Sequence, residues 1–140
     1  EITIVGIENP ENFRQIQNQQ ELFSHLNPLF VSRYPQHQSK DLVRWLKSIP
    51  NSYLHFGDFD LSGIGIYMNE YNMHLQERAS FFVPDHIENL LKSYGNSNLY
   101  NYQKANFKMS QIQDQKLLKL IDLIHHYQKG LEQEVLVGNI

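Results

Sequence analysis

The stretch from residue 51 to residue 63, NSYLHFGDFDLSG, constrains the fold of this chain more than any other. An apolar and aromatic run leads to Gly57, two carboxylates follow at Asp58 and Asp60, and a helix-like segment opens at Gly63. This order indicates a buried strand that delivers two acidic side chains at its carboxyl end. Because side chains alternate along a strand, Asp58 and Asp60 share one side and can converge on one point.

Two carboxylates held this close repel each other unless a cation or a shared proton lies between them. Oxygen ligands are those that Mg²⁺ and Mn²⁺ prefer, so the pair Asp58 and Asp60 suggests a divalent metal site. An isolated pair of this spacing is equally typical of a polar turn after a strand. His55 belongs to the opposite side of the strand, where it is expected to pack beneath a helix.

Strand-like and helix-like segments alternate along the chain with short links, the pattern of a parallel sheet covered on both faces. Asn9 and Pro10 have the chemistry of an N-cap and a first helical residue, and Asp85 with Glu88 resembles a capping box. We therefore expect an α/β fold, with a mainly parallel sheet of about four strands flanked by helices. The expected strands are 1–7, 28–31, 51–57 and 79–83. The expected helices are 10–26, 39–48, 63–74, 85–94 and an amphipathic one between Ser110 and Gly130, and 96–107 is expected to be a surface loop with at most a short helix.

The 140 residues are predicted to form one domain, since this length supports a single core. No apolar run is long enough to span a bilayer, and the lack of cysteine excludes disulfides and thiolate chemistry. The lack of cysteine agrees with a reducing, cytoplasmic location. Because the chain opens on Glu1 and not on Met, we expect it to be an excised domain or a processed product of a longer parent chain.

A third carboxylate, Glu8, follows the first expected strand. Ligands of open parallel sheets bind beyond the carboxyl ends of the strands, where the strand order switches. If the first and third strands are neighbours, Glu8, Asp58 and Asp60 surround one crevice. That convergence favours a metal site over three unrelated surface carboxylates.

The net charge of −3 provides no overall attraction to nucleic acid, so any DNA contact must be a local patch. Two weak patches have suitable side chains for phosphate contacts. Their alternative interpretation is a polar loop and the outer faces of helices, and Asp114 and Asp122 interrupt the charge of the second patch. The first patch holds Arg33, Lys40, Arg44 and Lys47; the second holds Lys104, Lys108, Lys116 and Lys119 among Tyr100, Tyr102 and Phe107.

Three segments, IENPENF, HFGDFDLSGIGI and LEQE, resemble a known family. They are similar to the Toprim-like C-terminal domain of the nuclease subunit of Wadjet anti-plasmid systems (JetD-type proteins), which is related to the Toprim domain of archaeal type IIB topoisomerases. The specific parts are Glu8 and Asn9 with Phe13, the G-D-x-D-x-x-G run at 57–63, and 131–134. The middle of the chain matches in pattern alone.

This resemblance implies a Toprim, Rossmann-like fold and cleavage of DNA phosphodiesters with Mg²⁺ or Mn²⁺, as one or two ions. Glu8, Asp58 and Asp60 would be the catalytic metal ligands, with Glu132 or Glu134 as an additional ligand. On the residues alone, the last two are equally well a solvated acidic tail.

Asn9, Gly57 and Gly63 would support the site. The implied partners are double-stranded DNA, the subunits of a condensin-like defence complex and the rest of the parent chain, with a homodimer as an open alternative and no membrane. The resemblance also implies that these residues are the C-terminal part of that parent chain and that the protein is cytoplasmic in a prokaryote.

Two other functions compete with the nuclease. The run from Asp58 to Ser62 resembles the nucleophile motif of haloacid-dehalogenase-like phosphatases, in which Asp58 would attack phosphate and Asp60 would act as acid and base. That family normally places its motif on the first strand, whereas here another strand and two helices precede it. The second alternative is a docking module that binds DNA or a partner without cleaving, and transesterification by a tyrosine of another domain also stays open.

Overall fold

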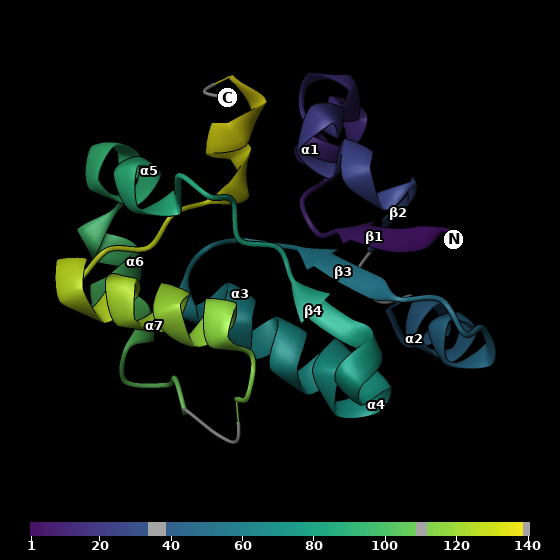
Figure 1. Ribbon diagram of the computed structural model, residues 1–140. Coiled ribbons are helices and arrows are strands. Elements are labelled where there is room, and N and C mark those ends of the chain that lie inside the picture. The colour runs from purple at the N-terminus through teal and green to yellow at the C-terminus, as the bar shows by residue number, and fades with distance from the viewer. Residues whose placement is uncertain (34–38, 109–111, 139–140) are drawn as a thin grey trace.

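Four parallel strands form one sheet in the order β2-β1-β3-β4, as the computed structural model shows for residues 1–33, 39–108 and 112–138 (Figure 1). The predicted α/β architecture is therefore confirmed. The strands are β1 (Thr3–Ile7), β2 (Pro28–Ser32), β3 (Tyr53–Phe56) and β4 (Ala79–Phe81).

The strand order reverses between β1 and β3. The chain passes from β1 to β2 on one side and then returns to β3 on the other side of β1. β1 and β3 are paired in register up to Ile7 and Phe56, and the Glu8 N–H donates to the Phe56 carbonyl oxygen at 3.1 Å. The first and third strands are therefore neighbours, as the sequence analysis assumed, and the backbone of Glu8 lies beside the end of β3.

Helical segments surround the sheet. In Figure 1, α1 lies on one side of it, α2 and α4 lie on the other, and α5, α6 and α7 gather past the carboxyl ends of the strands. None of the helices within the described ranges is long and apolar enough to cross a membrane. The helical segments are α1 (Pro10–Arg14), η1 (Ile16–Asn18), η2 (Gln20–Leu26), α2 (Ser39–Ser48), α3 (Leu61–Ile66), the π-helical η4 (Tyr67–Asn72), α4 (Met73–Leu75), η5 (Gln76–Arg78), α5 (Ile87–Tyr94), α6 (Ser97–Gln103), α7 (Gln115–Tyr127) and η6 (Gln133–Val137).

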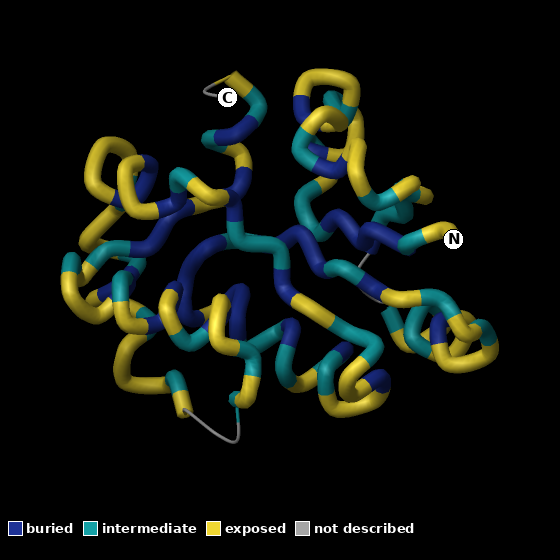
Figure 2. The backbone as a smooth tube through the Cα atoms, viewed as in Figure 1, coloured by how far each residue is buried: buried dark blue, intermediate teal, exposed yellow. Residues whose placement is uncertain are grey.

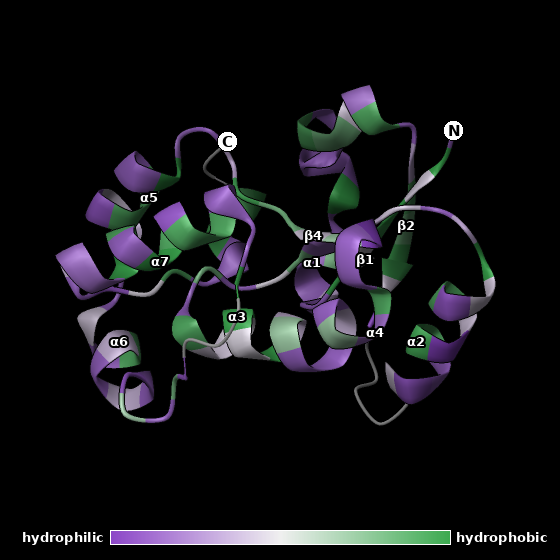
Figure 3. Cartoon of the chain, turned by 60° about the horizontal axis from the view of Figure 1, so that its bottom comes forward, coloured by the Kyte–Doolittle hydropathy of each residue, from purple (hydrophilic) through white to green (hydrophobic). Residues whose placement is uncertain are grey.

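The core lies around the two central strands, and the buried segments of Figure 2 run through them. Alternate residues of β3 face different layers: the Phe56 ring packs on Phe23 of η2, whereas Tyr53 stacks on Tyr71 of η4 with ring centroids 4.9 Å apart. α5 and α7 contact each other, and both carry a hydrophobic and a hydrophilic side (Figure 3). Of the predicted amphipathic stripe of α7, Leu117, Ile121 and Ile124 are buried, whereas Leu118 is half-buried and Leu120 is buried in addition.

Residues 10–26, predicted as one helix, form instead a short α-helix and two 3₁₀ segments. Asn9 is the N-cap, as expected, but α1 ends at Arg14. The side chain of Gln19 donates to the carbonyl oxygens of Asn12 and Gln15 at 3.3 and 3.0 Å. In a continuous helix these carbonyl oxygens would accept hydrogen bonds from backbone N–H groups. Here the polar side chain of Gln19 competes with those N–H groups for them.

Other helix ends also differ from the sequence prediction. The Asp85 capping box is wrong, because α5 begins at Ile87 with His86 as its N-cap and without a side-chain cap bond. Residues 96–107 contain α6, whose N-cap is Asn96. Ser110 lies outside the described residues, and the N-cap of α7 is Asp114.

Candidate acidic site at the strand ends

Glu8 is largely buried beside two nitrogen-bearing side chains. Its Oε2 lies 3.0 Å from His55 Nε2 and its Oε1 lies 3.5 Å from Arg33 Nη1, and its side chain is 11% exposed. His55 is fully buried, as predicted, and its Nδ1 lies 2.8 Å from the Tyr53 hydroxyl. Glu8 is therefore held in place by contacts that reach into the core.

Asp58 follows β3 and accepts a hydrogen bond at Oδ1 from the backbone N–H of Gln133 at 2.9 Å. Burial, together with the negative charges of Asp60, Glu8 and Glu132, raises the pKa of Asp58 to about 7 despite that hydrogen bond. The charges of Glu8 and Asp60 therefore act on Asp58. We call Glu8, Asp58 and Asp60 the acidic site.

Asp60 is the N-cap of α3, and its Oδ1 accepts a hydrogen bond from the Gly63 N–H at 2.7 Å. It is 3% exposed and also bonds the side chain of Gln103. Burial raises the pKa of Asp60, with further contributions from Glu8 and Glu132. The sequence placed the helix start at Gly63, whereas the cap chemistry belongs to Asp60 itself.

Gly57 and Gly63 leave room for the acidic site. A Cβ atom at residue 57 would lie 2.7 Å from Glu8 Oε2 and 2.8 Å from His55 Nε2. A Cβ atom at residue 63 would lie 2.3 Å from the Asp58 carbonyl oxygen. Side chains at these two positions would displace the groups that carry the carboxylates.

Gln133 is a site residue that the sequence analysis missed. It is fully buried, and beyond its N–H bond to Asp58 its Oε1 accepts from the Asn9 N–H at 3.1 Å and its Nε2 donates to the Phe56 carbonyl oxygen at 3.1 Å. Its own carbonyl oxygen accepts from Asn12 Nδ2 at 2.9 Å. In the sequence, Gln133 could have been found from its position between Glu132 and Glu134 in the segment LEQE.

The two flanking acids differ in position. The negative charge of Glu132 contributes to raising the pKa of both Asp58 and Asp60. The Oε1 of Glu134 instead accepts a hydrogen bond from Asn9 Nδ2 at 2.8 Å, in an exposed position at the start of α1. Of the two, Glu132 is therefore the one whose charge acts on the acidic site.

The carboxylate oxygens of the acidic site are suitable ligands for a divalent cation. In this structure, however, they are not arranged around a common point. Within residues 1–33, 39–108 and 112–138, no three His, Asp or Glu side chains are arranged so that they could hold a metal ion. Glu8 is engaged by His55 and Arg33, while Asp58 and Asp60 each use Oδ1 for a backbone N–H. The metal site stays a prediction.

The basic residues of the two predicted patches differ in how exposed they are and in what they contact. Arg33 is 7% exposed and its Nη2 lies 2.7 Å from Glu70 Oε2, so it pairs with a carboxylate and is not an exposed phosphate contact. Lys40 and Arg44 are exposed on α2. Lys104 lies over the Tyr100 ring with its Nζ 5.9 Å from the centroid, and Lys108 lines a cavity between α3 and α6.

A family model described as a domain of unknown function, DUF7281, matches residues 1–139. The chain belongs to the DUF7281 family. No curated protein and no solved structure matches it. The acidic site of this DUF7281 chain lies within the matched residues.

The stability of the DUF7281 chain should depend on pH through Asp58. Its pKa of about 7 in the folded chain lies above its ordinary value of 3.8, so the folded chain retains a proton that the unfolded chain releases. This contribution to stability is complete below about pH 4 and is lost as the pH rises through about 7. We expect the free energy of unfolding, measured by urea denaturation, to fall less over this range in Asp58→Asn. Equal pH slopes in the two proteins would contradict the raised pKa.

Proposed function

We propose that the DUF7281 chain is a metal-dependent nuclease domain that hydrolyses DNA phosphodiesters at Glu8, Asp58 and Asp60. The observation that carries this proposal is the position of these carboxylates at the ends of β1 and β3, the strands between which the strand order reverses. Ligands of parallel sheets bind at this switch point. The resemblance to the Toprim-like domain of the Wadjet nuclease subunit supports the same residues.

Mg²⁺ or Mn²⁺, as one or two ions, would be held by Asp58, Asp60 and Glu8. A bound ion would neutralise the phosphate, lower the pKa of a bound water and stabilise the leaving oxygen. The chain itself orients the carboxylates: the N–H groups of Gln133 and Gly63 fix the two aspartates. The negative charge of Glu132 adds to the attraction for a cation.

Arg33 and His55 have positioning roles in this proposal. Both contact the carboxylate of Glu8, and neither lies on an exposed surface. They would limit the rotation of Glu8 and set its direction toward the end of β3. We further propose that double-stranded DNA is brought to the site by the condensin-like complex that the resemblance implies.

The direct test is nicking of a supercoiled plasmid at low salt by the DUF7281 chain, with Mn²⁺, with Mg²⁺ or with a chelator. We expect nicked and linear DNA with either metal, more with Mn²⁺, and none with the chelator. Intact plasmid in the presence of Mn²⁺ would refute the nuclease. Release of phosphate from a small monoester without DNA cleavage would favour the phosphatase in which Asp58 is the nucleophile.

A further inference from the structure

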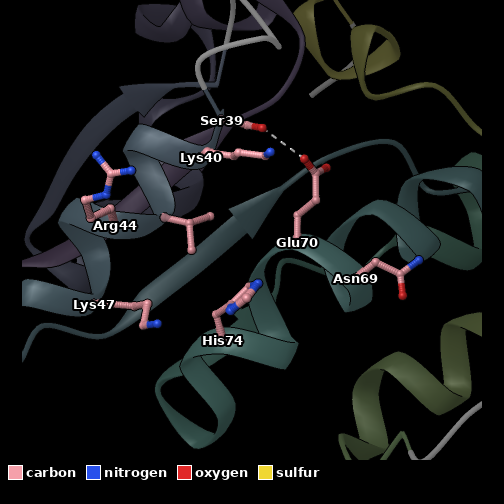
Figure 4. Close-up of a pocket in the computed structure, with 8 residues that line it drawn as sticks. Ser39, Lys40, Arg44, Lys47, Asn69, Glu70 and His74 are labelled. Carbon is pink, nitrogen blue, oxygen red and sulfur yellow. Dashed lines mark hydrogen bonds between the residues drawn. The ribbon is translucent and has the colours of Figure 1, made fainter.

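A cavity with a volume of about 520 Å³ separates α2 from η4 and α4 (Figure 4). One wall is the exposed side of α2, and the other comes from the helical run that follows β3. We call it the α2 cavity and define it by Ser39, Lys40, Arg44, Lys47, Glu70 and His74. It lies outside the acidic site, and it is large enough to admit a phosphate group of a nucleic-acid backbone.

The α2 wall is cationic. Lys40, Arg44 and Lys47 recur at helical spacing, so all three line the cavity from one helix face. In Figure 4 the ends of the Lys40 and Lys47 side chains point toward the opposite helix. Arg44 lies 3.5 Å from Asp41 in an exposed pair, which is a weak interaction in water.

The carboxylate of Glu70, on the other wall, is already neutralised. Arg33 Nη2 lies 2.7 Å from its Oε2 and 3.0 Å from its Oε1, and the Ser39 hydroxyl donates to Oε1 at 3.1 Å. The charge of Glu70 is therefore partly offset by Arg33, which does not line the cavity. The cavity retains the charge of three basic side chains and attracts an anion.

Contacts link the α2 cavity to the acidic site. Glu70 pairs with Arg33, and Arg33 also lies 3.5 Å from Glu8. Without bound metal the acidic site repels a phosphate, and the whole chain is acidic with a net charge of −3. Affinity for DNA requires cations that are separate from these carboxylates. The α2 cavity supplies three of them, and the contacts of Arg33 connect its Glu70 wall to Glu8.

We propose that the α2 cavity binds a backbone phosphate of double-stranded DNA and so holds the substrate beside the acidic site. This inference rests on the proposed nuclease function for the identity of the anion. Lys40, Arg44 and Lys47 make the phosphate contacts. Such contacts are independent of base sequence and depend strongly on salt.

The test measures binding of a fluorescein-labelled duplex by fluorescence anisotropy, in chelator, over a range of salt concentrations. The variant Lys40→Ala/Arg44→Ala/Lys47→Ala should bind about tenfold or more weakly at low salt, and the slope of log K against log salt should become shallower by about 2 to 3. The matched control, Arg14→Ala/Lys92→Ala/Lys129→Ala, removes the same charge from positions outside both basic patches, on α1, on α5 and just after α7. It should bind nearly as tightly as the wild type.

Equal losses in the two triple variants, or unchanged binding by the α2 variant, would overturn the proposal. Saturable binding of inorganic phosphate without DNA binding would assign the cavity to a free anion and would overturn it as well. The assay needs neither metal nor cleavage, so the two proposals fail separately. DNA binding that depends on α2 in a chain that never cuts DNA would refute the nuclease and leave the cavity assignment intact.

Discussion

Asp58→Asn is expected to slow metal-dependent DNA cleavage by roughly a hundredfold or more, since the charge stabilisation that a metal ion supplies is worth several kcal/mol. Asparagine keeps an oxygen that can accept the hydrogen bond from the Gln133 N–H, so the loss reports on charge and not on folding. Asp60→Asn should behave similarly, because asparagine is as good an N-cap for α3 as aspartate. The measurement is the initial rate of plasmid nicking with Mn²⁺.

The matched control is Asp122→Asn, which makes the same chemical change at an exposed position of α7. Its nicking rate should equal that of the wild type. Asp60→Ala is a less clean variant, because loss of the cap costs about 1 kcal/mol of stability. Cleavage at the wild-type rate by both Asp58→Asn and Asp60→Asn would show that the chemistry lies elsewhere in the chain.

Gln133→Ala is expected to cause the largest loss of stability among the polar substitutions at this site, roughly 2–4 kcal/mol. The substitution removes the acceptor of the Asn9 N–H and the donor to the Phe56 carbonyl oxygen in a fully buried position. Buried polar groups left without partners carry the full cost of their desolvation. The measurement is the free energy of unfolding from urea denaturation.

Gln115→Ala provides the comparison, because Gln115 is an exposed glutamine of α7. Its free energy of unfolding should stay within about 0.5 kcal/mol of the wild type. If Gln133→Ala lowers the free energy of unfolding by no more than this control, the side-chain hydrogen bonds of Gln133 do not hold the C-terminal segment against the ends of β1 and β3.

Local patterns were sufficient to predict the architecture and the position of the carboxylates. The alternation of strands and helices gave the parallel sheet, and Asn9 with Pro10 gave the start of α1. These features depend on residues close together in the sequence. The adjacency of β1 and β3 was a stated condition of the acidic site, and the strand order meets it.

Long-range side-chain pairs could not be predicted in the same way. Arg33 has the sequence context of a surface cation, and its burial follows from partners at Glu8 and at Glu70, 37 residues away. Gln133 contacts Asp58 and Asn9 across separations of 75 and 124 residues. No periodicity encodes such contacts, since they depend on how the finished layers pack.

The position of Glu8 illustrates both cases. Strand alternation correctly predicted that His55 packs beneath a helix, apart from the aspartates. Glu8 nevertheless reaches His55 from the neighbouring strand, across Gly57, where a side chain would block the contact. His55 is therefore a partner of Glu8, and the alternation of side chains along β3 alone could not predict this contact.

The most direct test of the acidic site is a crystal structure of the DUF7281 chain with Mn²⁺, in which anomalous scattering locates the metal. We predict one or two Mn²⁺ ions at the carboxyl ends of β1 and β3, with carboxylate oxygens of Asp58, Asp60 and Glu8 as ligands. Saturating Mn²⁺ that leaves these carboxylates without a bound ion, with Glu8 still on His55 and Arg33, would contradict the account.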